Sequence, residues 1–246
     1  FADAGILMSF RFIFWSAVVL LIISASAGWI FFGTHEPDPE QVRQQIVRNI
    51  LETARKQAVD GNIQTWTAYG RALIEAPKSM QDPKAAMTWF RKAADKGYPP
   101  AQVGIGDIYA NGLGVPEDHY RATEWYELAA RLSRYPEAHF KLGEAYFRGI
   151  GVPQDYGAAV PYYRTAAAGG HPVARYILGS MYEAGWGVDR DLIKAWLLYK
   201  RAMPDAARIT KHEETYDVAG AVTRIEREMN RSQREAAAKL LKAEGG

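Results

Sequence analysis

The sequence predicts an all-α protein: a single transmembrane helix, then a right-handed α/α solenoid of about four helical-hairpin repeats, closed by C-terminal capping helices. Three observations support this fold class. Residues 12–33 carry no charged side chain. Stretches that begin at Ala101, Ala138 and Ala174 align with one another at spacings of 37 and 36 residues. Each stretch combines apolar residues at helical spacing with a glycine-rich turn, the pattern of stacked helical repeats.

The composition indicates an ordered chain and excludes several kinds of function. Of the 246 residues, 48% are hydrophobic, and 30 Lys+Arg nearly balance 28 Asp+Glu. There is no cysteine, which excludes disulfides, a thiolate nucleophile and iron–sulfur ligation. The net charge of +2 is too small for the electrostatic footprint of a nucleic-acid binder, so no nucleic-acid partner is expected.

The first predicted element is a transmembrane helix within residues 1–33. Its charge-free stretch, residues 12–33, is 22 residues long, and at ~1.5 Å per residue a helix of that length crosses a ~30 Å hydrocarbon core. A cleaved signal peptide is the alternative, with Ala25-Ser26-Ala27 as its cleavage site. The apolar run continues past that site to Phe32, which favours an uncleaved anchor.

The charges that flank the span predict its orientation. Arg11 precedes it, whereas the first arginine after it is Arg43, and positive charge favours the cytoplasmic side. We therefore expect the N terminus inside and the repeats outside. In a bacterium this places the span in the inner (cytoplasmic) membrane and the repeats in the periplasm.

The remaining sequence divides into a linker, two capping regions and four repeats. A short linker at 34–39 precedes an N-terminal capping helix at 40–61, with Ile46 and Ile50 expected to face inward. In the C-terminal capping region, Ser232 and Glu235 match the capping box that opens a helix. The repeats and this region are expected at 62–97, 98–133, 134–170, 171–204 and 205–246.

One repeat predicts two helices joined by a tight turn. In the best copy, Ala138, Leu142 and Ala145 share one face of a first helix, and Gly143 leaves room for a neighbouring helix. The Gly149-Ile-Gly-Val152 motif then supplies residues that accept positive φ after a helix end. Asp155 is suited to cap the second helix.

The second helix carries bulky side chains into the expected core. Trp89, Trp125 and Tyr162 occur at equivalent positions and are predicted to fill the space within each hairpin. Pro161 lies inside one of these helices, where the missing backbone donor predicts a kink or a local break.

These motifs, written best in residues 138–167, closely resemble the Sel-one-like repeat, a relative of the tetratricopeptide repeat. The resemblance covers about residues 62–203. It implies an adaptor or scaffold that holds partner proteins, often in envelope signalling, secretion or the assembly of membrane complexes. It implies no reaction.

The resemblance also implies where partners bind. In tetratricopeptide repeats the first helix of each hairpin lines the concave face, and the fixed glycine at 106, 143 and 179 sets the register. Residues that vary around this glycine are the candidates for protein binding: Asp107, Asn111, Phe140, Glu144, Phe147, Arg148, Tyr176 and Glu183. The alternative is that some of these side chains only pack between helices. Their mixture of rings and charges suits a protein or peptide ligand.

The sequence therefore predicts a non-catalytic, membrane-anchored scaffold. We expect an accessory or assembly subunit of an integral-membrane complex, with energy-transducing complexes among the candidates. A regulator that transiently binds a sensor or secretion component is the alternative, and an envelope hydrolase is a remote one. The repeated Gly-x-Gly is interpreted as a turn and not a phosphate loop, and the repeated aspartates as helix caps and not metal ligands. We expect no cofactor, no metal and no small-molecule substrate.

Overall fold

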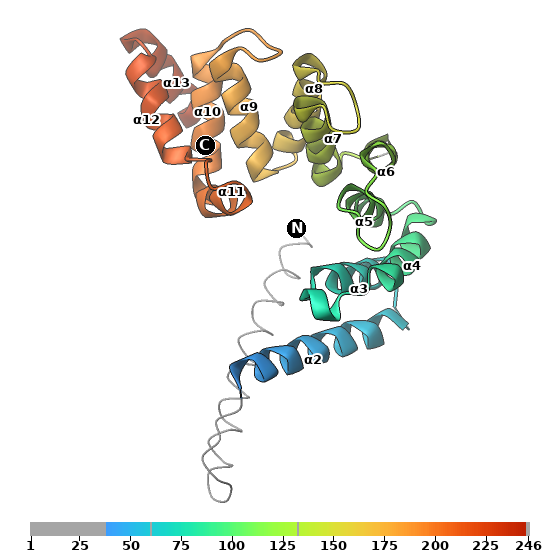
Figure 1. The fold of residues 1–246 in the computed structure, drawn as a ribbon. Coiled ribbons are helices and arrows are strands. Elements are labelled where there is room, and N and C mark those ends of the chain that lie inside the picture. The colour runs from blue at the N-terminus through green and yellow to red at the C-terminus, as the bar shows by residue number, and fades with distance from the viewer. Residues whose placement is uncertain (1–37, 60, 132, 245–246) are drawn as a thin grey trace, which may run out of the picture. The chain divides into compact units, whose positions relative to one another are not determined.

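The computed structural model describes residues 38–59, 61–131 and 133–244, and every regular element in those ranges is a helix (Figure 1). The chain divides into two units, residues 1–46 and 47–246, and the second unit contains the repeats. The predicted membrane span at 12–33 and most of the linker lie outside the described residues. Within them, no helix is long and apolar enough to cross a membrane.

Among the residues that the structure describes, four antiparallel helix pairs form the repeats, with one α-helix before them and three after. Within each pair, and between consecutive pairs, neighbouring helices are in contact. The elements in chain order are α2 (Pro39–Val59), α3 (Ile63–Glu75), η1 (Lys78–Met80), α4 (Pro83–Ala94), α5 (Pro99–Ala110), α6 (His119–Arg131), α7 (Pro136–Arg148), α8 (Tyr156–Ala168), α9 (Pro172–Ala184), α10 (Leu192–Ala202), η2 (Met203–Asp205), α11 (Ala206–His212), α12 (Val218–Glu228) and α13 (Arg231–Glu244).

The end of α2 packs against the first helix pair. Ala58 is fully buried, and Leu51 and Ala54 are partly buried against the same cluster. The indole N–H of Trp66 donates to the carbonyl of Ala58 at 3.0 Å, which joins α2 to α3. The expectation that Ile50 faces inward is wrong, because this side chain is 44% exposed.

The core of each hairpin is filled by the second residue of the aromatic pair, not the first. Phe90, Tyr126, Tyr163 and Tyr199 are buried, whereas Trp89, Trp125 and Tyr162 are only half-buried. This corrects the prediction for those three residues. The second residue lies over the glycine of the facing helix, so its ring enters the space that the missing side chain leaves.

The glycine-rich turn ends the first helix of a hairpin and also contacts the previous hairpin. Gly149 has a φ of 71° at the C-cap of α7, as the motif predicts. Gly151 has a φ of 77°, and a Cβ atom built there would lie 2.4 Å from the carbonyl oxygen of His119, at the start of the previous hairpin's second helix. The second glycine of the motif is therefore required for contact between hairpins.

The predicted aspartate caps are present. The side chain of Asp155 accepts a hydrogen bond from the backbone N–H of Ala158 at 2.9 Å, and Asp82, Asp118 and Asp191 make the equivalent bond. The backbone N–H of Asp155 also donates to the carbonyl of Tyr146 at 2.9 Å, which ties the cap to the preceding helix.

Pro161 does not break its helix. α8 runs continuously from Tyr156 to Ala168 with the proline inside it, so the expected local break is absent. Pro161 is exposed, and the Thr165 hydroxyl donates to its carbonyl at 3.0 Å.

The capping box of α13 lies two residues earlier than predicted. The N–H of Gln233 donates to the Asn230 side chain, and the Gln233 side chain accepts from the N–H of Asn230, each at 2.9 Å. Asparagine caps a helix as well as serine does, and glutamine replaces glutamate in the reciprocal bond. Glu235 instead pairs with Arg231 at 2.8 Å.

Candidate functional site

Seven of the eight predicted binding residues lie in α5, α7 and α9, the first helices of three consecutive hairpins, and the eighth, Asn111, is the C-cap of α5. The structure separates them into one open group, one covered group and one residue between hairpins. The open group lines a hollow, and the covered group lies beneath the C-terminal capping region.

The open group consists of Asp107, Asn111, Glu144 and Arg148. These residues line a hollow of about 200 Å³ that is formed by α5, α6, α7 and the turn after α7. The other residues of its wall are Ala110, His119, Ala122, Thr123, Tyr126, Lys141, Ala145 and Ile150. The hollow therefore joins two consecutive hairpins, and both acids and both cations reach it.

Asp107 is the most strongly held acid of the hollow. Its carboxylate accepts a hydrogen bond from the Tyr126 hydroxyl at 2.9 Å and forms an ion pair with the Lys141 ammonium at 3.3 Å. Burial acts to lower the pKa of Lys141, but the charges of Asp107, Glu137 and Glu144 outweigh it, so the pKa is raised. Lys141 therefore stays protonated, and its positive charge is fixed beside Asp107.

Glu144 is held more loosely. Its carboxylate lies 3.7 Å from the guanidinium of Arg148 and 3.6 Å from the imidazole of His212, and its side chain is 19% exposed. Both distances exceed those of a good charge-assisted hydrogen bond. Glu144 is therefore the acid of the hollow whose hydrogen-bonding capacity is least used.

Phe140 belongs to the covered group. It is 2% exposed, its ring stacks on the imidazole of His171 with a centroid separation of 4.1 Å, and His212 packs edge-on at 5.5 Å. This corrects the expectation that the ring lies on an open face. The side chain packs between α7, α9 and α11.

Tyr176 and Glu183 are also covered. Tyr176 is 8% exposed, and its ring lies between those of Tyr199 and Tyr216, at 5.3 and 4.7 Å. Glu183 accepts a hydrogen bond from the Tyr199 hydroxyl at 2.7 Å and pairs with the guanidinium of Arg224. Partial burial acts to raise the pKa of Glu183, but these hydrogen bonds outweigh it and lower the pKa below its usual value.

Phe147 lies apart from both groups. Its ring contacts Tyr156 of the same hairpin at 5.1 Å and Trp186 in the turn of the next hairpin at 5.7 Å. The structure thus gives Phe147 a packing role between hairpins.

Comparison with known proteins identifies the repeat. A family model described as the Sel1 repeat matches residues 74–98, 99–133, 136–171 and 172–202, which together make up more than half of the chain. The chain belongs to the Sel1 repeat family. The predicted resemblance is therefore confirmed, and membership indicates a scaffold for protein–protein interaction.

Two solved structures are similar to this Sel1 repeat chain. A Sel1 repeat protein from Oxalobacter formigenes is 26% identical, with a TM-score of 0.60, and the match covers 80% of this chain and 79% of that one. A protective antigen present in uropathogenic Escherichia coli strains, with an SLR fold, is 35% identical, with a TM-score of 0.56. That match covers 63% of this chain and 33% of the antigen, so this chain spans about a third of the antigen's length.

Sequence reasoning missed four residues that shape this Sel1 repeat surface. Tyr126 had a signal, because it is the second residue of the periodic aromatic pair. Lys141 lies two positions before the fixed Gly143, and this position is not among those expected to face the groove. His212 and Tyr216 lie outside the repeats and follow no period, so nothing in the sequence indicates that they cover Phe140 and Tyr176.

Proposed function

We propose that this Sel1 repeat protein is a non-catalytic, membrane-anchored scaffold that acts as an accessory or assembly subunit of an integral-membrane complex. One observation supports the protein-binding part most directly. Four of the eight residues chosen from the repeat register meet in one hollow, where charges from two consecutive hairpins are exposed together. Such a surface, with acids, cations and an apolar edge, suits a polypeptide partner.

The membrane part of the proposal rests on the sequence. Residues 12–33 are long and apolar enough to span a bilayer, and residues 34–39 would keep the repeats close to it. Tethering raises the effective concentration of the repeats near membrane partners, which favours a stoichiometric subunit.

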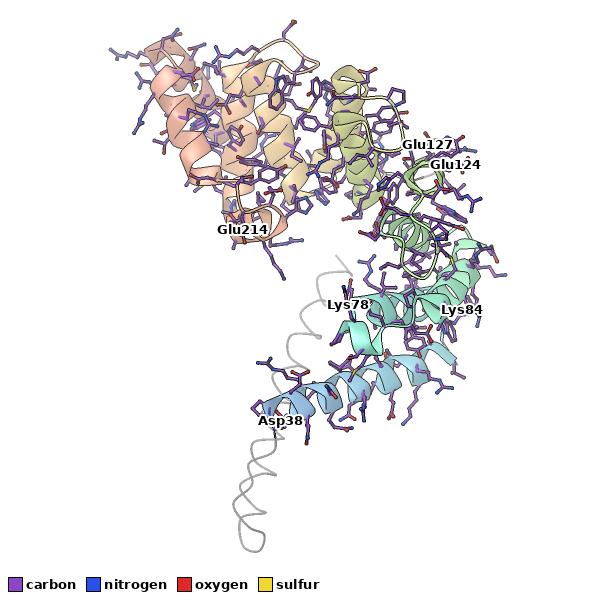
Figure 2. The ribbon with its side chains drawn as sticks, in the orientation of Figure 1. Asp38, Lys78, Lys84, Glu124, Glu127 and Glu214 are labelled. Atoms are coloured by element: carbon purple, nitrogen blue, oxygen red, sulfur yellow. The ribbon has the colours of Figure 1, made fainter. Side chains whose placement is uncertain are left out.

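Crosslinking in native membranes tests the proposal. The photoreactive residue p-benzoylphenylalanine is placed at Asn111, which is exposed at the hollow, and in a matched control at Glu124, which is exposed on α6 (Figure 2). We expect an adduct with an integral-membrane protein from position 111 and none from position 124. Equal labelling at both positions, or none, would reject the hollow as the binding surface.

Extraction tests the anchor separately. We expect the full chain to stay in the membrane fraction at high salt and alkaline pH and to leave it only with detergent. Release without detergent would reject the transmembrane helix.

We propose the inner membrane as the location, with the N terminus in the cytoplasm and the repeats in the periplasm. The flanking charges support this orientation, and both similar structures are bacterial. Protease added to spheroplasts should digest the repeats. Digestion only after the membrane is opened would reverse the orientation.

A further inference from the structure

Residues 211–217, called the strap below, cover part of the predicted binding face. The strap consists of the last two residues of α11 and the connection to α12, and it lies between two buried side chains, Ile209 and Val218. Its own outer residues are exposed, and Figure 2 shows Glu214 among them. The two buried side chains therefore fix the chain on both sides of the exposed strap residues.

The strap contacts the covered group through two side chains four residues apart. His212 packs edge-on against Phe140 at 5.5 Å and lies 3.6 Å from the carboxylate of Glu144. The Tyr216 ring packs against Tyr176 at 4.7 Å, and the positive charge of Arg148 acts on its hydroxyl group. Without these two side chains, predicted binding residues would be uncovered.

The surface beneath the strap contains an unused hydrogen-bonding group. In the hairpin before, the Tyr126 hydroxyl donates to Asp107, and in the hairpin after, the Tyr199 hydroxyl donates to Glu183. The equivalent Tyr163 hydroxyl is buried and has no hydrogen-bond partner among the residues that the structure describes. Since Glu144 occupies the position equivalent to Asp107, its pairing with the strap and Arg148 leaves Tyr163 unsatisfied, which is unfavourable.

The covered surface continues directly into the open hollow. Glu144 and Arg148 line the hollow, and the same two side chains are contacted by His212 and Tyr216 of the strap. The strap therefore covers one end of the proposed binding surface, and the hollow forms the other, open end.

From these contacts we propose that a protein partner docks on the surface of Phe140, Glu144, Arg148 and Tyr176 by taking the place of the strap. The partner presents the same chemistry: an imidazole or a cation for Glu144, and an aromatic ring four residues later for Tyr176. This proposal rests on the proposed scaffold function and names the kind of ligand.

A separate peptide with the sequence of the strap tests whether a ligand can take the place of the strap. A fluorescent peptide with the sequence of residues 208–218 is titrated into the detergent-solubilised full chain and into its H212A/Y216A variant, which keeps both anchors. The matched control is K211A/E214A, which changes exposed strap residues. We expect the peptide to bind H212A/Y216A at least ten-fold more tightly than either the wild type or the control. A peptide with alanine at the two contact positions should not bind.

Three further measurements make the result decisive. Adding E144A/R148A to the H212A/Y216A chain should abolish peptide binding. In the wild-type chain, excess peptide should speed hydrogen exchange at residues 211–217, which keeps the test valid if the variant folds poorly. Because the chain has no cysteine, an E144C/H212C variant can be locked with a thiol crosslinker, and the locked strap should exclude the peptide.

Equal binding to all three chains, or no binding to a folded H212A/Y216A chain at millimolar peptide, would overturn the proposal. Both results are obtained with purified protein alone. Failure of the membrane crosslinking would therefore reject the hollow as the surface that binds the membrane partner without changing the outcome of this test, and failure of this test would leave the crosslinking result unchanged.

Discussion

The fixed glycine in the first helix of each hairpin is explained by the ring that faces it. A Cβ atom on Gly106, Gly143 or Gly179 would lie 2.4, 2.7 or 2.9 Å from the nearest ring atom of the buried tyrosine. Real contacts of a Cβ atom are longer, so even a methyl group would displace the ring. The glycine therefore serves close packing within a helix, although glycine weakens helices intrinsically.

This packing predicts the effect of Gly143→Ala. We expect the variant to lower the free energy of unfolding by about 1–3 kcal/mol, because the new methyl group overpacks the site beside Tyr163. Urea unfolding measures the change. In a Tyr163→Val chain, which lacks the ring, the same substitution should cost less than about 0.5 kcal/mol, since alanine favours the helix. An equal loss in both backgrounds would show that the ring is not the cause.

The hydroxyl of Tyr126 is hydrogen-bonded and that of Tyr163 is not, among the described residues, and this difference gives a second prediction. Tyr163→Phe removes a buried hydroxyl that has no hydrogen bond, so stability should stay within about 0.5 kcal/mol or rise. Tyr126→Phe removes the donor to Asp107 and should cost about 1 kcal/mol or more. The two variants are compared by the urea concentration at the midpoint of unfolding, with the urea dependence of the free energy of unfolding held the same for both. Equal losses would mean that Tyr163 does have a partner in solution.

Among the helices, the contact between α9 and α12 depends on an ion pair. Glu183 near the end of α9 accepts hydrogen bonds from Arg224 of α12 and Tyr199 of α10, and its side chain is only 15% exposed. One carboxylate thus connects the last repeat to the C-terminal capping region.

The lowered pKa of Glu183 makes this contact sensitive to acid. Because the pKa in the folded chain lies below its ordinary value of 4.5, the ion pair stabilises the fold fully above about pH 4.5, and this contribution is lost as the pH falls through the folded pKa. Glu183→Gln should therefore be about 1–2 kcal/mol less stable than wild type at pH 7, with a smaller difference below pH 4.5. Thermal unfolding across this range tests it. The exposed Glu124→Gln serves as control, and a pH-independent gap for Glu183→Gln would contradict the prediction.

The sequence predicts the elements of one hairpin well because each is decided locally. The φ of Gly149 and the cap at Asp155 depend only on the residues beside them. Which residues of the binding face are exposed could not be predicted in this way. Phe140 and Tyr176 occupy the expected register but are covered by a segment outside the repeats, and that contact depends on tertiary packing.

On the scale of the unit formed by residues 47–246, apolar side chains gather in successive clusters along the repeats, as in other repeat proteins. The last cluster extends from α7 to α13 and includes buried residues of the capping region: Ile209, Val218, Ile225 and Met229, each at most 3% exposed. The capping helices therefore complete the core of the last repeat.

This dependence predicts the result of truncation. A chain that ends at Asp205 loses seven buried apolar side chains. The four large ones named above are together worth about 6–12 kcal/mol at roughly 1.5–3 kcal/mol each, a value comparable to the total stability of a domain. Because stability in a repeat array comes from neighbouring contacts, α9 and α10 should lose hydrogen-exchange protection while α3 to α6 retain it. A chain that ends at Met229 lacks only α13 and should keep α9 protected. Full protection of α9 in the shorter chain would show that the last repeat folds without its cap.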